Sequence, residues 1–175
     1  MNNTIFILLF RLMHIIGGGL WFGVAVFYLF FIHPSVQSIG PASAQFTQTL
    51  NNRKKYPLFM SIITTATIFS GIALYWISSG GFNFGWIQSD PGIGYSLGAL
   101  AGISAFFIGG FGISSAAGAL GALKKEIVSK ENEPNNQQAL LLNKLEKKLL
   151  RIEIADFIFL AAAMIFMATA RYWNF

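Results

Sequence analysis

TIFILLFRLMHIIGGGLWFGVAVFYLFFI, residues 4–32, contains Arg11 as its only charged residue. A helix needs about 20 mostly apolar residues to cross the hydrocarbon core of a bilayer, so this stretch predicts a membrane-spanning helix. It lacks the basic segment and the short apolar core of a cleavable signal peptide, and we expect it to stay in the mature chain. Its two ionisable side chains, Arg11 and His14, are costly in hydrocarbon and therefore indicate a function or a specific packing need.

The composition of the whole chain is that of a membrane protein. Of its 175 residues, 54% are hydrophobic and 11% are charged, whereas about a quarter of the residues of a soluble domain are charged. Further stretches at about 56–79, 91–123 and 152–173 are apolar and long enough to span a bilayer. The sequence therefore predicts an all-α fold, an integral membrane four-helix bundle. The absence of cysteine excludes disulfides, iron–sulfur clusters and thiolate zinc sites.

The basic residues predict how the chain lies in the membrane. Ten of them fall between the first and second stretches or between the third and fourth: Arg53, Lys54, Lys55, Lys124, Lys125, Lys130, Lys144, Lys147, Lys148 and Arg151. Only Arg11 and Arg171 belong to the other side. Because segments rich in Lys and Arg stay in the cytoplasm, we expect a multi-pass plasma-membrane protein with both termini outside. The net charge of +5 is thus a topology signal beside the lipid bilayer, and no nucleic-acid partner is expected.

Residues 118–151 predict a helical hairpin that extends the third and fourth helices into the cytoplasm. Pro134 suits the first turn of a helix, with Asn132 or Glu133 as its cap. This helix would begin near Asn135 and continue through the fourth span. Four apolar residues then recur at spacings of three and four, as in a coiled coil: Leu142, Leu145, Leu149 and Ile152. The alternative is a solvated, charged loop.

Glycines dominate the third span. Gly94, Gly98 and Gly102 follow one another at four-residue intervals, which doubles the small-xxx-small pattern. Such patterns let membrane helices approach each other closely. Three interpretations stay open: tight packing within the monomer, a seam between two copies, or a groove for a flat cofactor or a lipid.

The outer halves of the spans carry candidate ligands for a cofactor. We expect the first helix to enter the membrane at about Arg11, so that His14 lies about one turn in, and glycines follow one turn later. An imidazole nitrogen can ligate haem iron, glycines let a porphyrin approach a helix, and arginines can pair with its propionates. We therefore predict a haem b site with His14 as the metal ligand. The other residues of this predicted site are Arg11, Gly17, Gly18, Tyr75, Met167 and Arg171, with Tyr95 at the same depth.

A simpler interpretation of His14 is a hydrogen bond to a neighbouring helix, with Arg11 reaching the headgroups. His33 lies about 28 Å further along the same helix, so the two histidines cannot hold one haem within one chain. A sixth iron ligand would be a methionine, a residue of a partner subunit, or absent. We interpret His33-Pro34 as the cytoplasmic end of the first helix, because the residue before a proline disfavours the α conformation.

Asp156 is the second costly residue, about one turn inside the fourth span. One interpretation is a salt bridge or cap with Arg53, Lys54 or Arg151, and the other is a proton-relay carboxylate. A relay needs more than one acid, and only Glu153 lies at the same depth. The sequence has no catalytic triad, zinc signature, P-loop or dinucleotide fingerprint, so we expect no catalytic activity.

Residues 12–28, LMHIIGGGLWFGVAVFY, resemble the first helix of small bacterial membrane proteins of the CopD-like and HemJ-like group. In that group, a helix of the pattern Leu-His-hydrophobic-small-Trp-x-Gly carries a histidine associated with haem b or porphyrin. Residues 53–76, RKKYPLFMSIITTATIFSGIALYW, resemble the second helix of the group. The resemblance implies that His14 is the haem or porphyrin ligand. The third span lacks the lysine of the HemJ-like subgroup, and Met/His clusters typical of a copper route are missing, so neither protoporphyrinogen oxidation nor copper transport is expected.

The sequence leaves two functions. The first is a haem b protein that transfers electrons, or a redox-associated subunit, with its haem held near the outer face by His14. The second is a non-catalytic accessory or structural subunit of a larger membrane complex, which packs through the glycine-rich third helix. In either case we expect a homo-oligomer or a subunit of a membrane complex.

Overall fold

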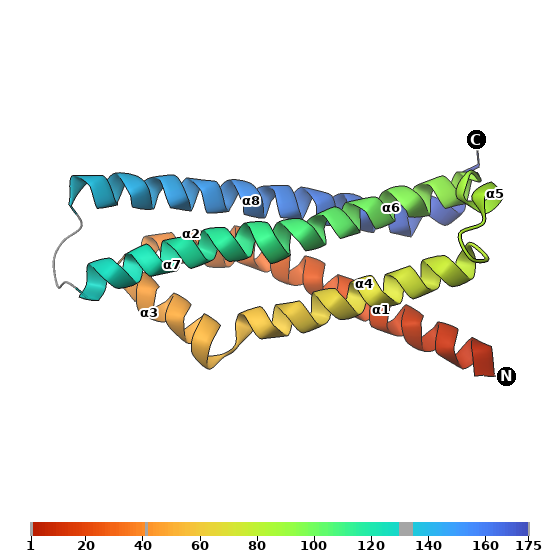
Figure 1. Ribbon diagram of the computed structural model, residues 1–175, viewed down its shortest axis with the longest axis horizontal. Helices are drawn as coiled ribbons and strands as arrows, with labels where there is room; N and C mark the ends of the chain where they lie inside the picture. The colour runs from red at the N-terminus through yellow and green to blue at the C-terminus, as the bar shows by residue number, and fades with distance from the viewer. Residues whose placement is uncertain (1, 41, 130–134, 175) are drawn as a thin grey trace.

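The computed structural model describes residues 2–40, 42–129 and 135–174, and over these residues the chain is helical with no strand. Figure 1 shows an elongated bundle with both chain termini at one end, here named the terminal end. The opposite end, named the basic end, carries the segments rich in Lys and Arg. Three helical stretches are long and apolar enough to cross a membrane: Thr4–Ser38, Tyr56–Ser78 and Asp90–Ile127. The all-α prediction is confirmed, with three candidate membrane spans.

The first span is one continuous helix made of α1 (Asn2–Phe27), the π-helical turn η1 (Tyr28–Ile32) and α2 (His33–Ser38). The predicted helix end at His33-Pro34 is therefore wrong. Proline lacks an N–H and clashes with the carbonyl four residues back in a regular α-helix. Here a wider π turn precedes the proline, as shown by the hydrogen bond from the His33 N–H to the Tyr28 carbonyl. Pro34 then lies in the first turn of α2.

The connection to the second span is also helical. It consists of α3 (Ala42–Gln48) and a second π turn, η2 (Thr49–Arg53). Lys55 then adopts a left-handed backbone conformation with φ of 52°, which turns the chain into α4 (Tyr56–Ser78). Because of this geometry, α3 and η2 lie beside the other helices at the basic end and do not form an extended loop (Figure 1).

At the terminal end, a tight turn through Gly80 and Gly81, both with positive φ, leads into α5 (Phe84–Ile87). The third span then runs through α6 (Asp90–Phe107), a third π turn, η3 (Ile108–Ile113), and α7 (Ser114–Ser129). Gly92 is required in the first turn of α6, because a Cβ there would overlap the Trp86 carbonyl. At its other end, the third helix continues through α7 to Ser129, as the predicted hairpin requires.

The last helix, α8 (Asn136–Thr169), is followed by a short 3₁₀ turn, η4 (Ala170–Tyr172). Its cap is Asn135, whose side chain accepts the Gln138 N–H while the Gln138 side chain accepts the Asn135 N–H. The predicted caps Asn132 and Glu133, with Pro134, lie outside the described residues. The prediction of one long helix from near Asn135 is confirmed.

The two arms of the hairpin pack through the predicted apolar seam. Leu149 is buried, and Leu142, Leu145 and Ile152 are half-buried, whereas the neighbouring Leu140 is exposed. The seam places α8 against α7 at the basic end and against α6 at the terminal end (Figure 1). The charged residues between the seam positions stay at the surface.

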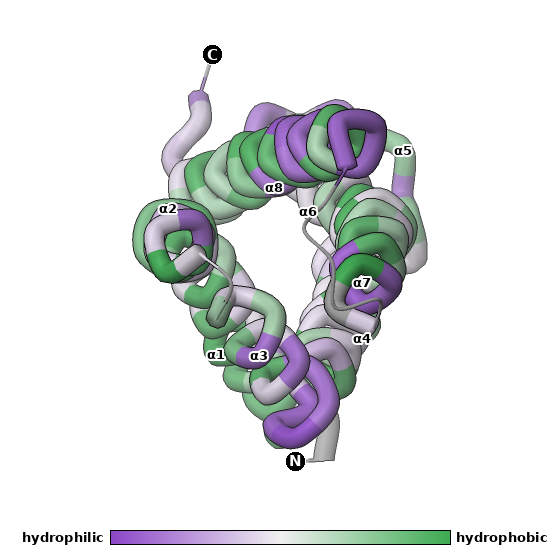
Figure 2. Tube along the Cα trace, turned by 90° about the vertical axis from the view of Figure 1, so that its left-hand side faces the viewer, coloured by the Kyte–Doolittle hydropathy of each residue, from purple (hydrophilic) through white to green (hydrophobic). Residues whose placement is uncertain are grey.

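The helices pack as two close pairs, α1 with α4 and α6 with α8. The glycines of α6 make the second pair close, because a Cβ at Gly94 would lie 2.7 Å from Ala170 Cβ and one at Gly98 would lie 2.9 Å from Met167 Cγ. Of the three interpretations of this pattern, the structure shows packing within the monomer at these two glycines. Toward the basic end, α1–α2 approaches α8, and the end-on view shows α8, α2, α3 and α7 arranged as a ring (Figure 2).

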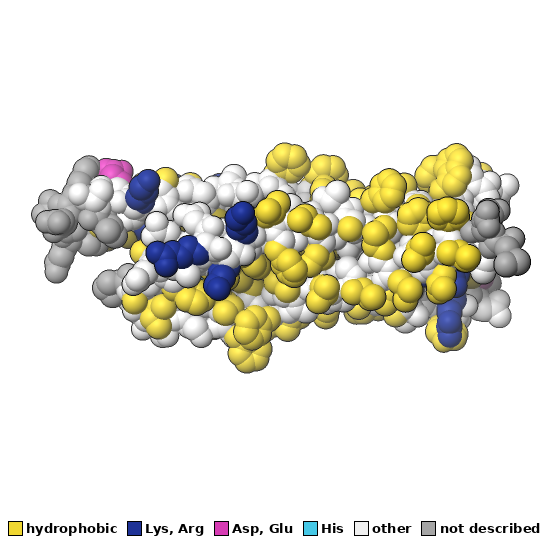
Figure 3. All heavy atoms as spheres, turned by 90° about the horizontal axis from the view of Figure 1, so that it is seen from below, with side chains coloured by type: hydrophobic (Ala, Val, Ile, Leu, Met, Phe, Trp, Pro, Cys, Tyr) yellow, Lys and Arg dark blue, Asp and Glu magenta, His cyan; other side chains and the backbone are white. Residues whose placement is uncertain are grey.

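The surface is divided along the long axis. Large apolar side chains are exposed on every membrane-length helix, among them Ile15, Ile62, Phe69 and Phe107. Figure 3 shows such side chains covering the middle and the terminal end of one face, with Lys and Arg gathered mainly toward the basic end. This distribution is what a bilayer around the apolar part of the bundle requires.

Candidate solute-binding cavity

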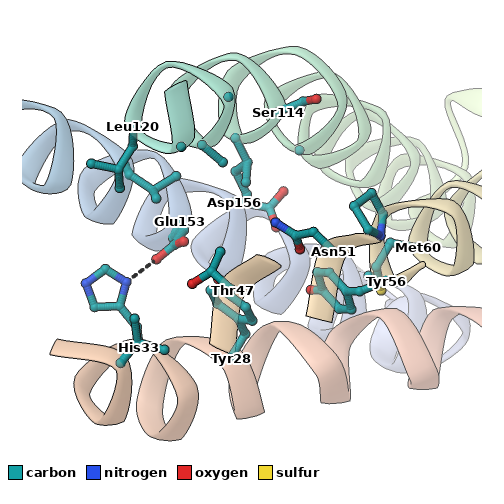
Figure 4. A pocket seen from close by; sticks show the side chains of 18 of the residues that line it. Tyr28, His33, Thr47, Asn51, Tyr56, Met60, Ser114, Leu120, Glu153 and Asp156 are labelled. Atoms are coloured by element: carbon teal, nitrogen blue, oxygen red, sulfur yellow. Dashed lines mark ion pairs between the residues drawn. The ribbon is translucent and has the colours of Figure 1, made fainter. Parts of the chain in front are cut away.

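A cavity of about 940 Å³ lies between the helices in the half of the bundle toward the basic end (Figure 4). We name it the basic-end cavity. All four long helical segments and the α3–η2 connection contribute to its wall. Its polar and charged lining residues are Tyr28, His33, Gln37, Gln45, Thr47, Gln48, Asn51, Asn52, Tyr56, Ser61, Thr64, Thr65, Ser114, Lys124, Lys125, Glu146, Glu153 and Asp156. Three of the seven acidic residues of the chain are in this lining, so polar chemistry is concentrated here.

Each of the three π-helical turns lies in the wall of this cavity. Tyr28 comes from η1, Asn51 from η2 and Gly109 from η3. A π turn inserts an extra residue into a helix, bulges its backbone and is frequent at functional sites. The π turns therefore lie in segments whose polar side chains or bare backbone line the basic-end cavity.

His33 and Glu153 form the most buried polar contact of the wall. His33 Nδ1 lies 2.9 Å from Glu153 Oε2, and the side chains are 12% and 7% exposed. Gln37 Nε2 lies 3.1 Å from His33 Nε2. Because an amide nitrogen only donates, Nε2 accepts from Gln37 and Nδ1 is the ring nitrogen that faces the carboxylate. Glu153 Oε2 nevertheless accepts no hydrogen bond within the described residues. The contact joins the first span to α8 across the cavity (Figure 4).

Asp156 lies one turn further along α8 and lacks such a partner. The residue is 5% exposed, and its Oδ1 accepts no hydrogen bond within the described part of the chain. The prediction of a salt bridge to Arg53, Lys54 or Arg151 is not met there, since all three are exposed at the surface. Figure 4 shows the carboxylate pointing into the cavity toward Asn51. A buried carboxylate without a partner is costly, so its retention needs an explanation.

Aromatic and apolar side chains form the inner part of the wall. Trp21 is only 5% exposed and packs in a small core with Ala105 and Leu160. The rings of Tyr28 and Tyr56 are stacked, with centroids 5.9 Å apart. Met60 and Phe106 complete this region. The inner cavity therefore combines aromatic rings with two carboxylates, Glu153 and Asp156.

Exposed residues in the lining mark where the cavity opens. One group lies at the basic end: Gln37, Gln45, Gln48, Asn52 and Lys125. A second group lies between α4 and the η3–α7 segment: Ser61, Thr65, Gly110 and Ser114. Near the first opening, Lys124 Nζ lies 2.9 Å from Glu146 Oε1 and ties α7 to α8. The cavity thus opens both at the basic end and at the side of the bundle.

The predicted haem residues lie elsewhere, in separate contacts near the terminal end. On α1, His14, Gly17 and Gly18 all face α4 around Thr67. Tyr75 bonds Ser96 of α6 at 2.6 Å, and Met167 packs on Gly98. Arg11 is exposed, and Arg171 lies over its neighbour Tyr172 at the surface.

His14 forms a hydrogen bond to the neighbouring helix α4, as the simpler interpretation of this residue expects. Its Nδ1–H donates to the Thr67 carbonyl at 2.9 Å, and its ring fills the space above Gly71, where a Cβ would lie 2.7 Å from Cε1. A histidine that binds a metal often donates its other N–H to a carbonyl in this way. His14 lines neither the basic-end cavity nor the small surface groove beside Phe82. Haem b binding at His14 stays a prediction from the sequence.

No family model, curated protein or solved structure matches this chain. The resemblance of residues 12–28 and 53–76 to the CopD-like and HemJ-like group therefore also stays a prediction. The candidate site rests on the geometry of the basic-end cavity and on the chemistry of its lining.

Proposed function

We propose that this chain is an integral membrane protein that binds a small polar solute in the basic-end cavity. One observation carries the proposal: a cavity of about 940 Å³ with a polar lining lies within a bundle of apolar, membrane-length helices. Ligand sites for small molecules have volumes of about 300–1,000 Å³ and a few converging polar groups. Irregular, non-α backbone at membrane depth is tolerated where it lines such a cavity, as the π turns η1 and η3 do here.

The proposal includes the orientation and the fourth span. The apolar half of α8 lies along α6, itself part of a candidate span, and exposes Ile154, Ile158 and Ile165 outward. We infer that it also crosses the bilayer and completes a four-helix membrane bundle. The excess of Lys and Arg at the basic end favours a cytoplasmic position for that end in the plasma membrane, with both termini outside. The cavity would then open to the cytoplasm.

Cysteine labelling tests this proposal directly, because the chain has no cysteine of its own. Single cysteines replace Thr64, which lines the cavity, and Ile62, which is exposed on the apolar surface of the same helix. A membrane-impermeant maleimide is added to inside-out vesicles and to intact cells. We expect Thr64→Cys to react in inside-out vesicles only, and Ile62→Cys to stay unlabelled because lipid covers it.

Gln88→Cys provides the control for the opposite side. Gln88 is exposed beside α5 at the terminal end, so its cysteine should react in intact cells. An unlabelled Thr64→Cys beside a labelled Gln88→Cys would show that water does not reach the cavity and would overturn the proposed function. Labelling of Thr64→Cys from intact cells would keep the cavity and reverse the orientation.

A further inference from the structure

Two carboxylates inside the basic-end cavity have a buried oxygen that accepts no hydrogen bond within the described residues: Glu153 Oε2 and Asp156 Oδ1. Lys124 pairs with Glu146 near the opening, and Glu153 contacts His33. Lys125 is exposed. Asp156 is 5% exposed, faces the cavity and has an unpartnered Oδ1 in the described part of the chain.

Taken together with the proposed function, on which this inference rests, the geometry points to an organic ammonium ion as the solute, with its charged nitrogen at Asp156. A carboxylate and an ammonium group form a charge-assisted hydrogen bond, which is stronger than a neutral one. Such a ligand supplies the positive charge and the N–H donor that Asp156 lacks. Glu153 lies one turn away on the same face of α8 and adds a second negative group.

The aromatic wall suits the same class of solute. Trp21, Tyr28 and Tyr56 all line the cavity, and the last two stack on each other. The faces of aromatic rings attract ammonium groups, most strongly where water is excluded. Met60 and Phe106 offer apolar contact for a hydrocarbon part of the solute.

A divalent metal ion fits this site less well. No group of three or more His, Cys, Asp and Glu side chains comes together among the residues that the structure describes. Asp156 and Glu153 are thus without a third strong ligand of this kind. An anion would face two buried acids in the inner cavity, with Lys124 already paired near the opening.

Three probes with the same phenyl ring and similar length separate charge from shape: phenethylammonium, 2-phenylethanol and phenylacetate. Binding to the full chain in detergent micelles is measured by calorimetry and by thermal stabilisation, because a ligand of the folded state raises its stability. We expect phenethylammonium to bind and the neutral and anionic probes not to bind. Asp156→Asn should weaken binding by about tenfold or more, as expected for loss of a hydrogen bond to a charged group.

Asp90→Asn is the matched control, since Asp90 lies at the terminal end, away from the cavity, and its replacement should leave binding unchanged. Asp156→Glu, which keeps the charge, should retain measurable binding and also shows that the position tolerates replacement. Equal binding of 2-phenylethanol, preferred binding of phenylacetate, no binding of phenethylammonium, or full binding by Asp156→Asn would each overturn the inference.

Protection of the cysteine at position 64 separates this inference from the proposed function. We expect phenethylammonium to slow the labelling of Thr64→Cys severalfold. Labelling that is rapid and unaffected by phenethylammonium would refute the ammonium ligand while leaving a hydrated cavity in place. A cysteine that never reacts would instead refute the proposed function.

Discussion

His33 Nδ1 lies 2.9 Å from Glu153 Oε2, so that the end of the first span is joined to α8 by a contact that solvent barely reaches. The contact holds the first span and α8 together across the basic-end cavity (Figure 4). Lys124 and Glu146 repeat the arrangement between α7 and α8 at a more exposed level. Polar contacts thus replace, around the cavity, the close backbone packing that glycines provide at the terminal end.

His33→Ala should lower the free energy of unfolding by about 2 kcal/mol, because the buried Glu153 carboxylate then loses its nearest polar contact. Denaturant titration in mixed micelles measures this change. Gln37→Ala is the control, since Gln37 is exposed and its removal should cost less than about 0.5 kcal/mol. Equal effects of the two substitutions would mean that the contact to Glu153 contributes little.

Asp156→Leu should raise the thermal stability of the protein measured without solute. The substitution removes a buried carboxylate that has no partner in the described residues, and the cavity has room for the larger side chain. Functional groups of this kind are commonly retained at a cost in stability. Glu146→Leu serves as comparison and should change stability by less than about 1 kcal/mol, since it breaks a partly exposed pair. A fall in stability for Asp156→Leu would indicate that the carboxylate supports the fold.

Gly94→Ala should destabilise the α6–α8 pair by about 1–3 kcal/mol, the usual cost of overpacking. The added Cβ would lie 2.9 Å from Ala170 Cα, which belongs to the backbone and cannot rotate away. Gly102→Ala is the matched control, because its Cβ would meet only Ala163 Cβ, at 3.9 Å. The two variants are compared by thermal unfolding in the same detergent. Similar melting temperatures would contradict the close approach at Gly94.

His14→Ala tests the sequence prediction of haem and the observed packing together. Loss of the hydrogen bond to Thr67 should destabilise the protein by about 1 kcal/mol or more. Absorption spectra of air-oxidised and dithionite-reduced protein, made with adequate haem supply, decide the haem question. A Soret band that disappears in His14→Ala would establish the iron ligand. Featureless spectra for both proteins would leave helix packing as the role of His14.

Much of the fold follows from simple patterns in the sequence. Long apolar runs predict the helices, and the leucines at 142, 145 and 149 predict the arrangement of α7 and α8. Other features depend on geometry that single residues do not reveal. Pro34 is compatible with a continuing helix because a π turn precedes it. The residues of that turn, 28–32, carry no sequence pattern that predicts it.

The candidate site was only half visible in the sequence. Glu153 and Asp156, three residues apart in an apolar stretch, are a signal that local reasoning can find. The contact of Glu153 with His33 could not be found in this way, because it joins residues of two helices that are far apart in the sequence. The polar residues of α3 and η2 were missed for a similar reason, since a segment expected to be a loop folds back as part of the wall. His14, the histidine that the sequence singles out, lies toward the opposite end of the bundle.

The three π turns have a consequence for how such a cavity arises and is lost. Each holds one residue more than the α-helical turn it replaces. Deletion of one codon within residues 28–32, 49–53 or 108–113 would restore regular α-helix there and leave the flanking residues on their original faces. Single-residue insertions and deletions at these three positions would therefore add or remove bulges in the wall of the basic-end cavity. The apolar residues on the outside of the spans would not have to change.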